Sequence, residues 1–184
     1  TIFVRTPPAI NHKKLKIHEI EFKELEKYKD LIKGDILFSA LGTTKKDAGG
    51  KEQQYEIDYT YQYEFAKIAA ENGVAIYSLV SSVGANAKSS FFYPKIKGAL
   101  EEAVKKLDFQ KIDIFQPPML IRQPDLMRDG EKSGIKILNK LNKIGILKSQ
   151  KPLAVEQLAE KMLKMAKTPS KEKTTTYLPK GLFS

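Results

Sequence analysis

The sequence predicts an α/β fold built around a parallel sheet. Three observations lead to this prediction: strand-length apolar runs alternate with helix-length amphipathic segments, residues 74–80 are almost continuously apolar, and residues 92–107 carry apolar side chains at helical spacing. A continuous apolar run is typical of a strand that is covered on both faces, as in parallel sheets. Strands that alternate with helices are joined by crossover connections, which favours parallel neighbours.

In the N-terminal half, each expected element has a local signal. Thr1–Arg5 is rich in β-branched and aromatic residues, which favours a strand, and Pro7 ends it. A helical spacing of apolar residues comes later, and Gly34 closes that helix. The expected elements are a strand at 1–5, a short strand at 15–19, a helix at 22–33, a buried strand at 35–40, a turn at 42–44 and a polar loop at 45–51.

In the rest of the chain, apolar stripes at helical spacing again alternate with short apolar runs. Proline is tolerated in the first turn of a helix but not later, so Pro94 requires its helix to begin at Phe92 or Tyr93. The expected inner stripe of the long helix at 53–71 consists of Ile57, Tyr61, Phe65, Ile68 and Ala69. The expected elements are helices at 53–71, 92–107, 135–141 and 155–166, and strands at 74–80, 112–115 and 174–178.

Composition excludes several kinds of site. The chain has no cysteine, which excludes disulfides and Cys-ligated zinc, and its two histidines argue against a metal or Ser-His-Asp site. The formal net charge is +10, but lysines and glutamates are interspersed, as on solvated helix faces. No apolar run is long enough to span a membrane, and no signal peptide is visible. We therefore expect a cytoplasmic protein that binds neither nucleic acid nor membrane.

Three unusual stretches follow predicted strands. They are Arg5, residues 41–44, and the pair Ser81 and Ser82. The carboxyl ends of parallel strands meet at one edge of the sheet, and ligands of open α/β sheets bind there. We therefore expect these residues to lie together at a binding site.

Tyr93 and Lys97 are four residues apart, so a helix places them on one face. A nearby ammonium group lowers the pKa of a phenol and lets it transfer a proton near neutral pH. A strand-end serine could then hydrogen-bond a substrate carbonyl. Carbonyl reduction also needs a hydride, which no side chain donates, so a nicotinamide cofactor is implied. Tyr-x-x-x-Lys alone is a weak motif, and its place beside the strand-end serines is what strengthens it.

Taken together, the motifs resemble those of the short-chain dehydrogenase/reductase superfamily, in its atypical branch around the HIV Tat-interacting-protein oxidoreductases and their bacterial and fungal relatives. The similarity extends from residue 1 to about residue 128. It is carried by Leu41-Gly42-Thr43-Thr44, Ala48-Gly49-Gly50, VSSVGA at 80–85, SSFFYPKIKGALE at 89–101, LDF at 107–109 and Phe115-Gln116-Pro117-Pro118.

The resemblance implies a Rossmann-type, doubly wound parallel sheet and a set of roles. Tyr93 is the implied proton donor and acceptor, and Lys97 lowers its pKa and holds the nicotinamide ribose. Ser82 or Ser81 orients the substrate carbonyl, because the register of the two serines is open. The implied cofactor contacts are Arg5 at the adenosine 2′-phosphate, Leu41, Gly42 and Thr43 along the adenine ribose and pyrophosphate, Leu120 beside the nicotinamide, and Arg128 closing over the cofactor.

The chain departs from this family in three places, one of which is Pro94, directly after the tyrosine of the motif. The glycine-rich loop that follows the family's first strand does not occur in the sequence. In this fold that strand lies between the second and the fourth, so we expect a central gap in the sheet and about 25–30 further residues in the native protein. Gln116-Pro117-Pro118 stands where relatives commonly have Arg-Pro-Gly, which changes the side chains beside the nicotinamide.

The sequence therefore predicts an NADP(H)-dependent oxidoreductase, a monomer or homodimer that acts on an unknown small-molecule carbonyl or alcohol; NAD is the less favoured cofactor. Residues 1–184 are expected to form one NAD(P)-binding domain, with 123–150 as its variable, substrate-side segment. The same fold allows an NADPH-binding regulatory or redox-sensing protein with little catalysis. A nucleic-acid-binding protein is a third reading, supported by the net charge alone.

Overall fold

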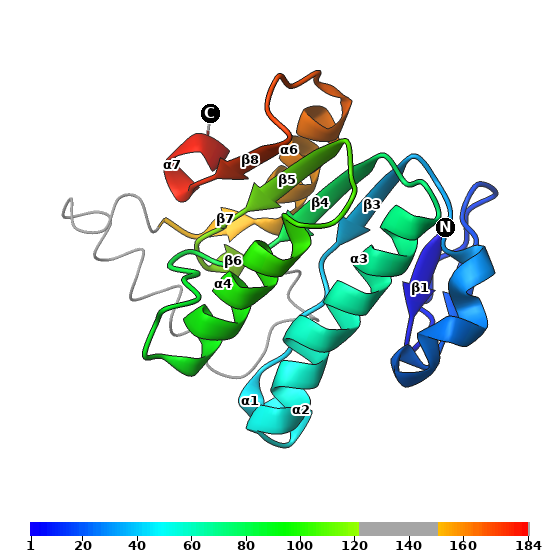
Figure 1. Ribbon diagram of the computed structural model, residues 1–184, viewed down its shortest axis with the longest axis horizontal. Helices are drawn as coiled ribbons and strands as arrows, with labels where there is room; N and C mark the ends of the chain where they lie inside the picture. The colour runs from blue at the N-terminus through cyan, green and yellow to red at the C-terminus, as the bar shows by residue number, and fades with distance from the viewer. Residues whose placement is uncertain (122–150, 184) are drawn as a thin grey trace.

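The computed structural model describes residues 1–121 and 151–183, and its centre is a four-stranded parallel sheet (Figure 1). The strands run in the order β3 (Ile36–Ser39), β4 (Ile76–Val80), β5 (Lys111–Phe115) and β8 (Thr174–Tyr177). Figure 1 shows α3 (Tyr61–Glu71) and α4 (Phe92–Val104) in front of this sheet, and α6 (Val155–Lys167) behind it. Helices on both faces of a parallel sheet confirm the predicted α/β, doubly wound fold.

The two faces of the sheet belong to two hydrophobic clusters. On β5, Ile112 and Ile114 pack with α3 and α4, whereas Phe115 packs with Leu158 and Met162 of α6. Successive residues of a strand point to opposite faces, so one short apolar segment serves both clusters. β5 is buried along its whole length, including its two charged residues, Lys111 and Asp113.

β1 (Ile2–Val4) and β2 (Ile17–Glu19) form a separate two-stranded parallel sheet. Among the described residues, β1 pairs with β2 alone and β3 pairs with β4 alone, so each of β1 and β3 has one edge without a strand partner. A cavity of about 670 Å³, lined by both strands and by Phe65, lies beside these edges. This arrangement agrees with the expected central gap.

The expectation that residues 35–40 form a buried strand is wrong in its burial. β3 occupies most of this segment, but Phe38 is 42% exposed. The strand lines the cavity on one side and therefore lacks a neighbour that would cover it.

The segment before β3 is a 3₁₀ helix, η1 (Phe22–Leu31), rather than the expected α-helix. Its helical backbone is interrupted at Glu24, and among its residues Leu25 is buried. The end of η1 is tied to the body by Asn72, whose side-chain amide donates to the carbonyl oxygens of Lys29 and Ile32 at 2.7 and 2.9 Å. Long-range contacts of this kind hold a geometry that helical propensity alone does not select.

The long helix expected at 53–71 forms, but with a change of winding. It begins as α2 (Lys51–Tyr55), passes through a π-helical turn, η2 (Glu56–Thr60), and continues as α3. Part of the expected polar loop at 45–51 is also helical, as α1 (Lys45–Ala48), because the Thr44 hydroxyl accepts from the Asp47 amide and caps it.

The π-helical turn coincides with an inner stripe that differs from the predicted one. Gln54, Asp58 and Gln62 are buried along this helix, whereas Ile57 and Tyr61 are half-buried. Phe65, Ile68 and Ala69 face the core as predicted.

The C-terminal half follows the prediction closely. α4 begins at Phe92 with Pro94 in its first turn, and β5, α6 and β8 fall where the pattern places them. The structure adds a short parallel pair, β6 (Leu120–Ile121) with β7 (Leu153–Ala154), and a final helix, α7 (Pro179–Leu182). The helix predicted at 135–141 and the whole of the segment 123–150 lie outside the described residues.

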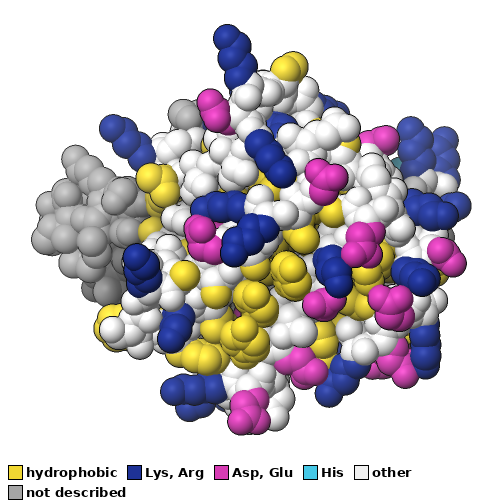
Figure 2. Space-filling model, in the orientation of Figure 1, with side chains coloured by type: hydrophobic (Ala, Val, Ile, Leu, Met, Phe, Trp, Pro, Cys, Tyr) yellow, Lys and Arg dark blue, Asp and Glu magenta, His cyan; other side chains and the backbone are white. Residues whose placement is uncertain are grey.

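The visible surface mixes both signs of charge. Figure 2 shows basic and acidic side chains interspersed on this face. Exposed ion pairs one helical turn apart include Lys27 with Glu24 and Lys29 with Glu26. Within the described residues, no helix has the length and apolar character needed to cross a membrane.

Candidate active site

The predicted tyrosine and lysine both lie on α4, but in different surroundings. Tyr93 is in the first turn and is 40% exposed, whereas Lys97, one turn later, is 2% exposed. The Lys97 ammonium group donates to the carbonyl oxygen of Val80, the last residue of β4, at 3.1 Å. The helix therefore carries a partly exposed tyrosine one turn before a buried lysine whose ammonium group is hydrogen-bonded to a strand end.

The charge of Lys97 is set by opposing effects. Burial lowers its pKa, while the negative charges of Asp58 and then Glu101 act to raise it. An ammonium group taken out of water would otherwise tend to lose its proton.

The two strand-end serines differ in their burial and in their hydrogen-bond partners. Ser81 is buried, and its hydroxyl donates to Oε1 of Glu101. Ser82 is half-buried, and its hydroxyl has a long contact of 3.4 Å with the carbonyl oxygen of Val83. The hydroxyl of Ser81 is thus engaged inside the protein, whereas Ser82 is more exposed and less firmly held.

Glu101 links the ends of two strands. Besides Ser81 after β4, its carboxylate accepts from Nε2 of Gln116 after β5, at 3.0 and 3.1 Å to its two oxygens. Burial raises the pKa of Glu101, and the hydrogen bonds from Ser81 and Gln116 partly oppose that rise. Gln116, one of the departures from the family pattern, is therefore a direct partner of this carboxylate.

Asp58 makes a similar link on the other side of the site. Its Oδ1 accepts from the backbone amide of Thr43 at 3.3 Å, in the turn after β3. A Cβ on Gly42 would lie 3.2 Å from the same oxygen, a tight contact that glycine avoids. Sequence reasoning missed both Asp58 and Glu101. The sequence signal for each was an acidic residue at helical spacing from apolar residues. Such residues also occur on solvent-exposed helix faces, so this signal did not distinguish a buried carboxylate from an exposed one.

The loop between β4 and α4 is held closely against the helix. The amide of Asn86 donates to the carbonyl of Pro94 at 2.9 Å. A Cβ on Gly98 would overlap the backbone of Asn86 and Ala87. Gly98 therefore lets the loop that follows the serines pack directly on α4.

The remaining predicted residues are more dispersed. Arg5 is exposed just after β1, and Leu41 lines the cavity beside β1 and β3. Leu120 lies in β6 and packs against the cluster around Phe115. Arg128 lies outside the described residues.

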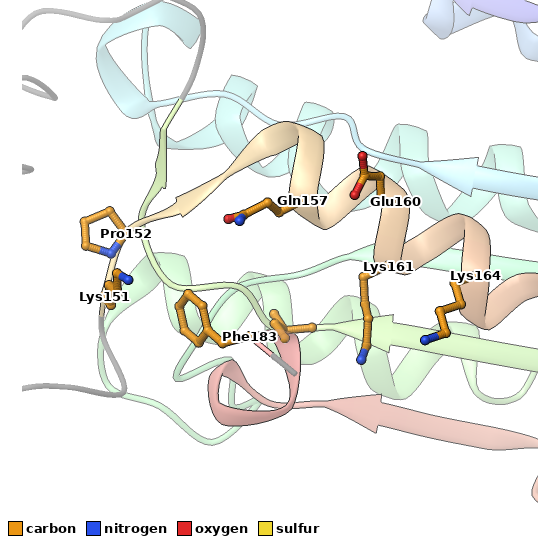
Figure 3. Close-up of a pocket in the computed structure, with 8 residues that line it drawn as sticks. Lys151, Pro152, Gln157, Glu160, Lys161, Lys164 and Phe183 are labelled. Carbon is orange, nitrogen blue, oxygen red and sulfur yellow. The ribbon is translucent and has the colours of Figure 1, made fainter.

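A second hollow, of about 420 Å³, lies against α6 and α7 (Figure 3). Lys151, Gln157, Lys161 and Phe183 are among the residues around it, and none of the predicted site residues that the structure describes lines it. Within residues 1–121 and 151–183, no group of acidic or histidine side chains is arranged to hold a metal ion.

Solved structures similar to this one include short-chain dehydrogenase/reductase and epimerase proteins, several of them with bound NAD or NADP. WbmG of Bordetella bronchiseptica in complex with NAD is 12% identical, covers 93% of this chain and 59% of its own, and has a TM-score of 0.64. A short-chain dehydrogenase/reductase superfamily protein from Agrobacterium tumefaciens with bound NAD is 10% identical, covers 96% of this chain and 69% of its own, and has a TM-score of 0.65. At this identity the likeness shows the fold, which is Rossmann-type.

The sequence is similar to fungal proteins named FMP52, and no family model matches it. It is 40% identical over 139 residues to "Protein FMP52-1, mitochondrial" of Scheffersomyces stipitis, covering 72% of this chain and 58% of the relative. It is 39% identical over 126 residues to the FMP52 protein of Candida albicans, covering 66% of this chain and 55% of the relative. The chain thus spans little more than half the length of these relatives.

These names correct the expected localisation. The relatives are named mitochondrial proteins, so the expectation of a cytoplasmic protein is wrong. That expectation rested on the lack of a visible targeting signal, and an address read by import receptors is not encoded in a sheet and its helices.

Proposed function

We propose that the chain belongs to an NADP(H)-dependent oxidoreductase of the short-chain dehydrogenase/reductase type, which acts on a small carbonyl or alcohol in mitochondria. One observation carries the proposal. Lys97 is buried one helical turn after the partly exposed Tyr93. Its ammonium group donates a hydrogen bond to the carbonyl oxygen of Val80, the strand residue that immediately precedes Ser81 and Ser82. The names of the FMP52 relatives support the compartment.

In this proposal Tyr93 donates a proton to the substrate oxygen during reduction and accepts it during oxidation. The ammonium group of Lys97 favours the phenolate and so brings the tyrosine into a useful range of pH. Ser82 holds the substrate carbonyl, because the Ser81 hydroxyl is already donated to Glu101. A bound nicotinamide supplies the hydride.

The turn after β3 is suited to a dinucleotide. Gly42 is exposed, and the backbone of Thr43 is fixed from within by Asp58 and Gln54. A fixed turn without a side chain at its tip lets a cofactor approach the backbone closely. Leu41, Gly42 and Thr43 would hold the adenosine side, with Leu120 and Arg128 on the nicotinamide side.

The preference for NADP over NAD rests on Arg5. Its guanidinium group is exposed at the end of β1, where it could meet a 2′-phosphate. Solved structures of the same fold were determined with either cofactor, for example a dTDP-4-dehydrorhamnose reductase with NADP at a TM-score of 0.62. We further propose the branch around the HIV Tat-interacting-protein oxidoreductases, a monomeric or homodimeric state, and no binding of nucleic acid or membrane.

The test is titration of the full-length protein with NADPH and NADH, followed by a carbonyl substrate screen. Micromolar NADPH binding that is weakened by Arg5→Ala, and turnover that is lost in Tyr93→Phe while binding persists, are the expected results. Tyr55→Phe is the matched control, because Tyr55 is a helical tyrosine with a similar exposure of 41%. Binding without turnover would favour the regulatory alternative. No binding of either nucleotide at millimolar concentration would overturn the proposal.

A further inference from the structure

Two buried carboxylates lie on the helix of Lys97 itself, α4, and on η2, which packs against α4. Asp58 lies in the π-helical turn η2, and Glu101 lies one turn after Lys97 on α4. Both carboxylates are almost completely excluded from solvent. Burial lowers the pKa of Lys97, and the charges of Asp58 and Glu101 oppose this effect.

Each carboxylate is also fixed to a strand end. Asp58 accepts from the amide of Thr43 after β3. Glu101 accepts from Ser81 after β4 and from Gln116 after β5. Lys97 itself donates to Val80 at the end of β4. The carboxyl ends of three neighbouring strands are thus connected to the two acids and the lysine.

We propose that Asp58 and Glu101 are positioning residues for Lys97, which hold its ammonium group at the ends of β3, β4 and β5 so that it can act on Tyr93. The catalytic consequence rests on the proposed oxidoreductase function. The effect on Lys97 itself does not, and it can be measured without turnover.

The physical reason is the cost of a buried charge. An isolated ammonium group in the interior becomes a neutral amine, and a neutral amine cannot stabilise a phenolate. Glu101 already serves two neutral donors, and burial raises its own pKa, so it is a weaker counter-charge than its position suggests. Asp58 supplies the second negative charge.

The groups that could compete are few among the described residues. Asp58 acts from η2 and Glu101 from α4, Tyr93 shares the helix face of Lys97, and Lys105 acts on Glu101. β4 and β5 contribute the uncharged Ser81 and Gln116. Replacing either carboxylate with the corresponding amide should therefore change the measured pKa of Lys97.

The experiment uses Asp58→Asn and Glu101→Gln in the full-length protein with ¹³C-labelled lysine, and Lys97→Met identifies the Lys97 signal in NMR titrations. Each amide variant is expected to lower the pKa of Lys97 by about one unit or more, because each removes a nearby opposite charge. Glu102→Gln is the matched control, since Glu102 is an exposed carboxylate on the same helix. A Lys97 pKa that moves in neither variant would overturn the proposal.

The pH profile of turnover gives a second readout. Where an amide variant leaves Lys97 neutral, the pKa of Tyr93 rises, so the profile for alcohol oxidation should move to higher pH. Asp58→Glu, which keeps the negative charge, should retain the wild-type profile. A wild-type protein without turnover would count against the proposed function, while the NMR result would still decide the role of the carboxylates. Unchanged profiles in both amide variants of an active protein would contradict the carboxylate proposal alone.

If an amide variant does not fold, the Lys97→Met background decides. Without the ammonium group there is no buried positive charge to compensate, so the double variants should fold. If the double variants also fail to fold, Asp58 and Glu101 have a general structural role, and the proposal is overturned.

Discussion

The ammonium group of Lys111 lies 3.1 Å from the Oδ2 atom of Asp113, two residues further along β5. Both side chains are buried on the α6 face of the sheet, although each would be charged in water. Lys111 also donates to the carbonyl oxygens of Met165 and Thr168, where α6 ends. Lys111 therefore forms an ion pair with a buried carboxylate and also donates hydrogen bonds to backbone carbonyls at the C-terminus of α6.

Lys111→Met should destabilise the protein by about 3–5 kcal/mol, because it leaves the buried Asp113 without its counter-charge. Unfolding in urea, followed by circular dichroism, measures the change. Lys27→Met is the control, since Lys27 forms an exposed pair with Glu24 at 2.6 Å, and its urea midpoint should barely move. Equal midpoints for the two variants would show that the Lys111 pair does not stabilise the fold.

The two strand-end serines should respond differently to the same substitution. Ser81→Ala removes a buried donor from Glu101 and should cost about 1–3 kcal/mol of stability. Ser82→Ala should leave stability within about 0.5 kcal/mol, since Ser82 is half-buried and, among the described residues, its hydroxyl makes one long contact. If the proposed reaction is correct, turnover should fall more in Ser82→Ala. Urea unfolding and steady-state kinetics test the pair, and the reverse ranking would reassign the register.

Gly98→Ala should destabilise the protein by about 1–3 kcal/mol, although alanine is the better helix former. The added Cβ would overlap the backbone of Asn86 and Ala87 and push the loop away from α4. Gly181→Ala is the control, because a Cβ there would meet no atom of the described residues within 4 Å. Thermal unfolding of both variants is the measurement. A Gly98→Ala protein as stable as the wild type would show that the loop does not depend on close approach to α4.

Tyr177 should make stability fall at alkaline pH. Burial, followed by the charge and hydrogen bonding of Asp113, raises the pKa of Tyr177 to about 12. An unfolded tyrosine titrates near pH 10, so this stabilisation is complete below about pH 10 and is lost as the pH rises toward 12. Tyr177→Phe should therefore lose less stability than the wild type over that window. Urea unfolding at a series of pH values tests this, and parallel curves for the two proteins would contradict it.

The elements that depend on local pattern were predictable. β4, β5 and α6 follow from runs and stripes of apolar residues, and the start of α4 follows from Pro94, because these signals lie within the segments themselves. The spacing of Tyr93 and Lys97 likewise places them on one helix face without reference to the rest of the chain.

The polar interior was not predictable in the same way. Gln54, Asp58 and Gln62 are buried, and each has a hydrogen-bond partner in the structure. For example, the side-chain oxygen of Gln62 accepts from the Ser39 hydroxyl at 2.9 Å, and its amide donates to the backbone carbonyl of Asp58 at 2.8 Å. A polar residue at helical spacing normally predicts a solvated face. Its burial depends on which strand end lies opposite, and the local pattern does not contain that information.

By itself, the sequence determined the alternation of strands and helices, the parallel sheet, and the pairing of an α4 tyrosine with an α4 lysine. The tertiary structure alone decided that Ser81 faces inward and Ser82 outward, that Asp58 and Glu101 bear on Lys97, and that Lys111 is buried beside Asp113. The reason is physical. Periodicity records which face of an element is apolar, whereas the pairing of a buried charge is set by residues brought together from distant parts of the chain.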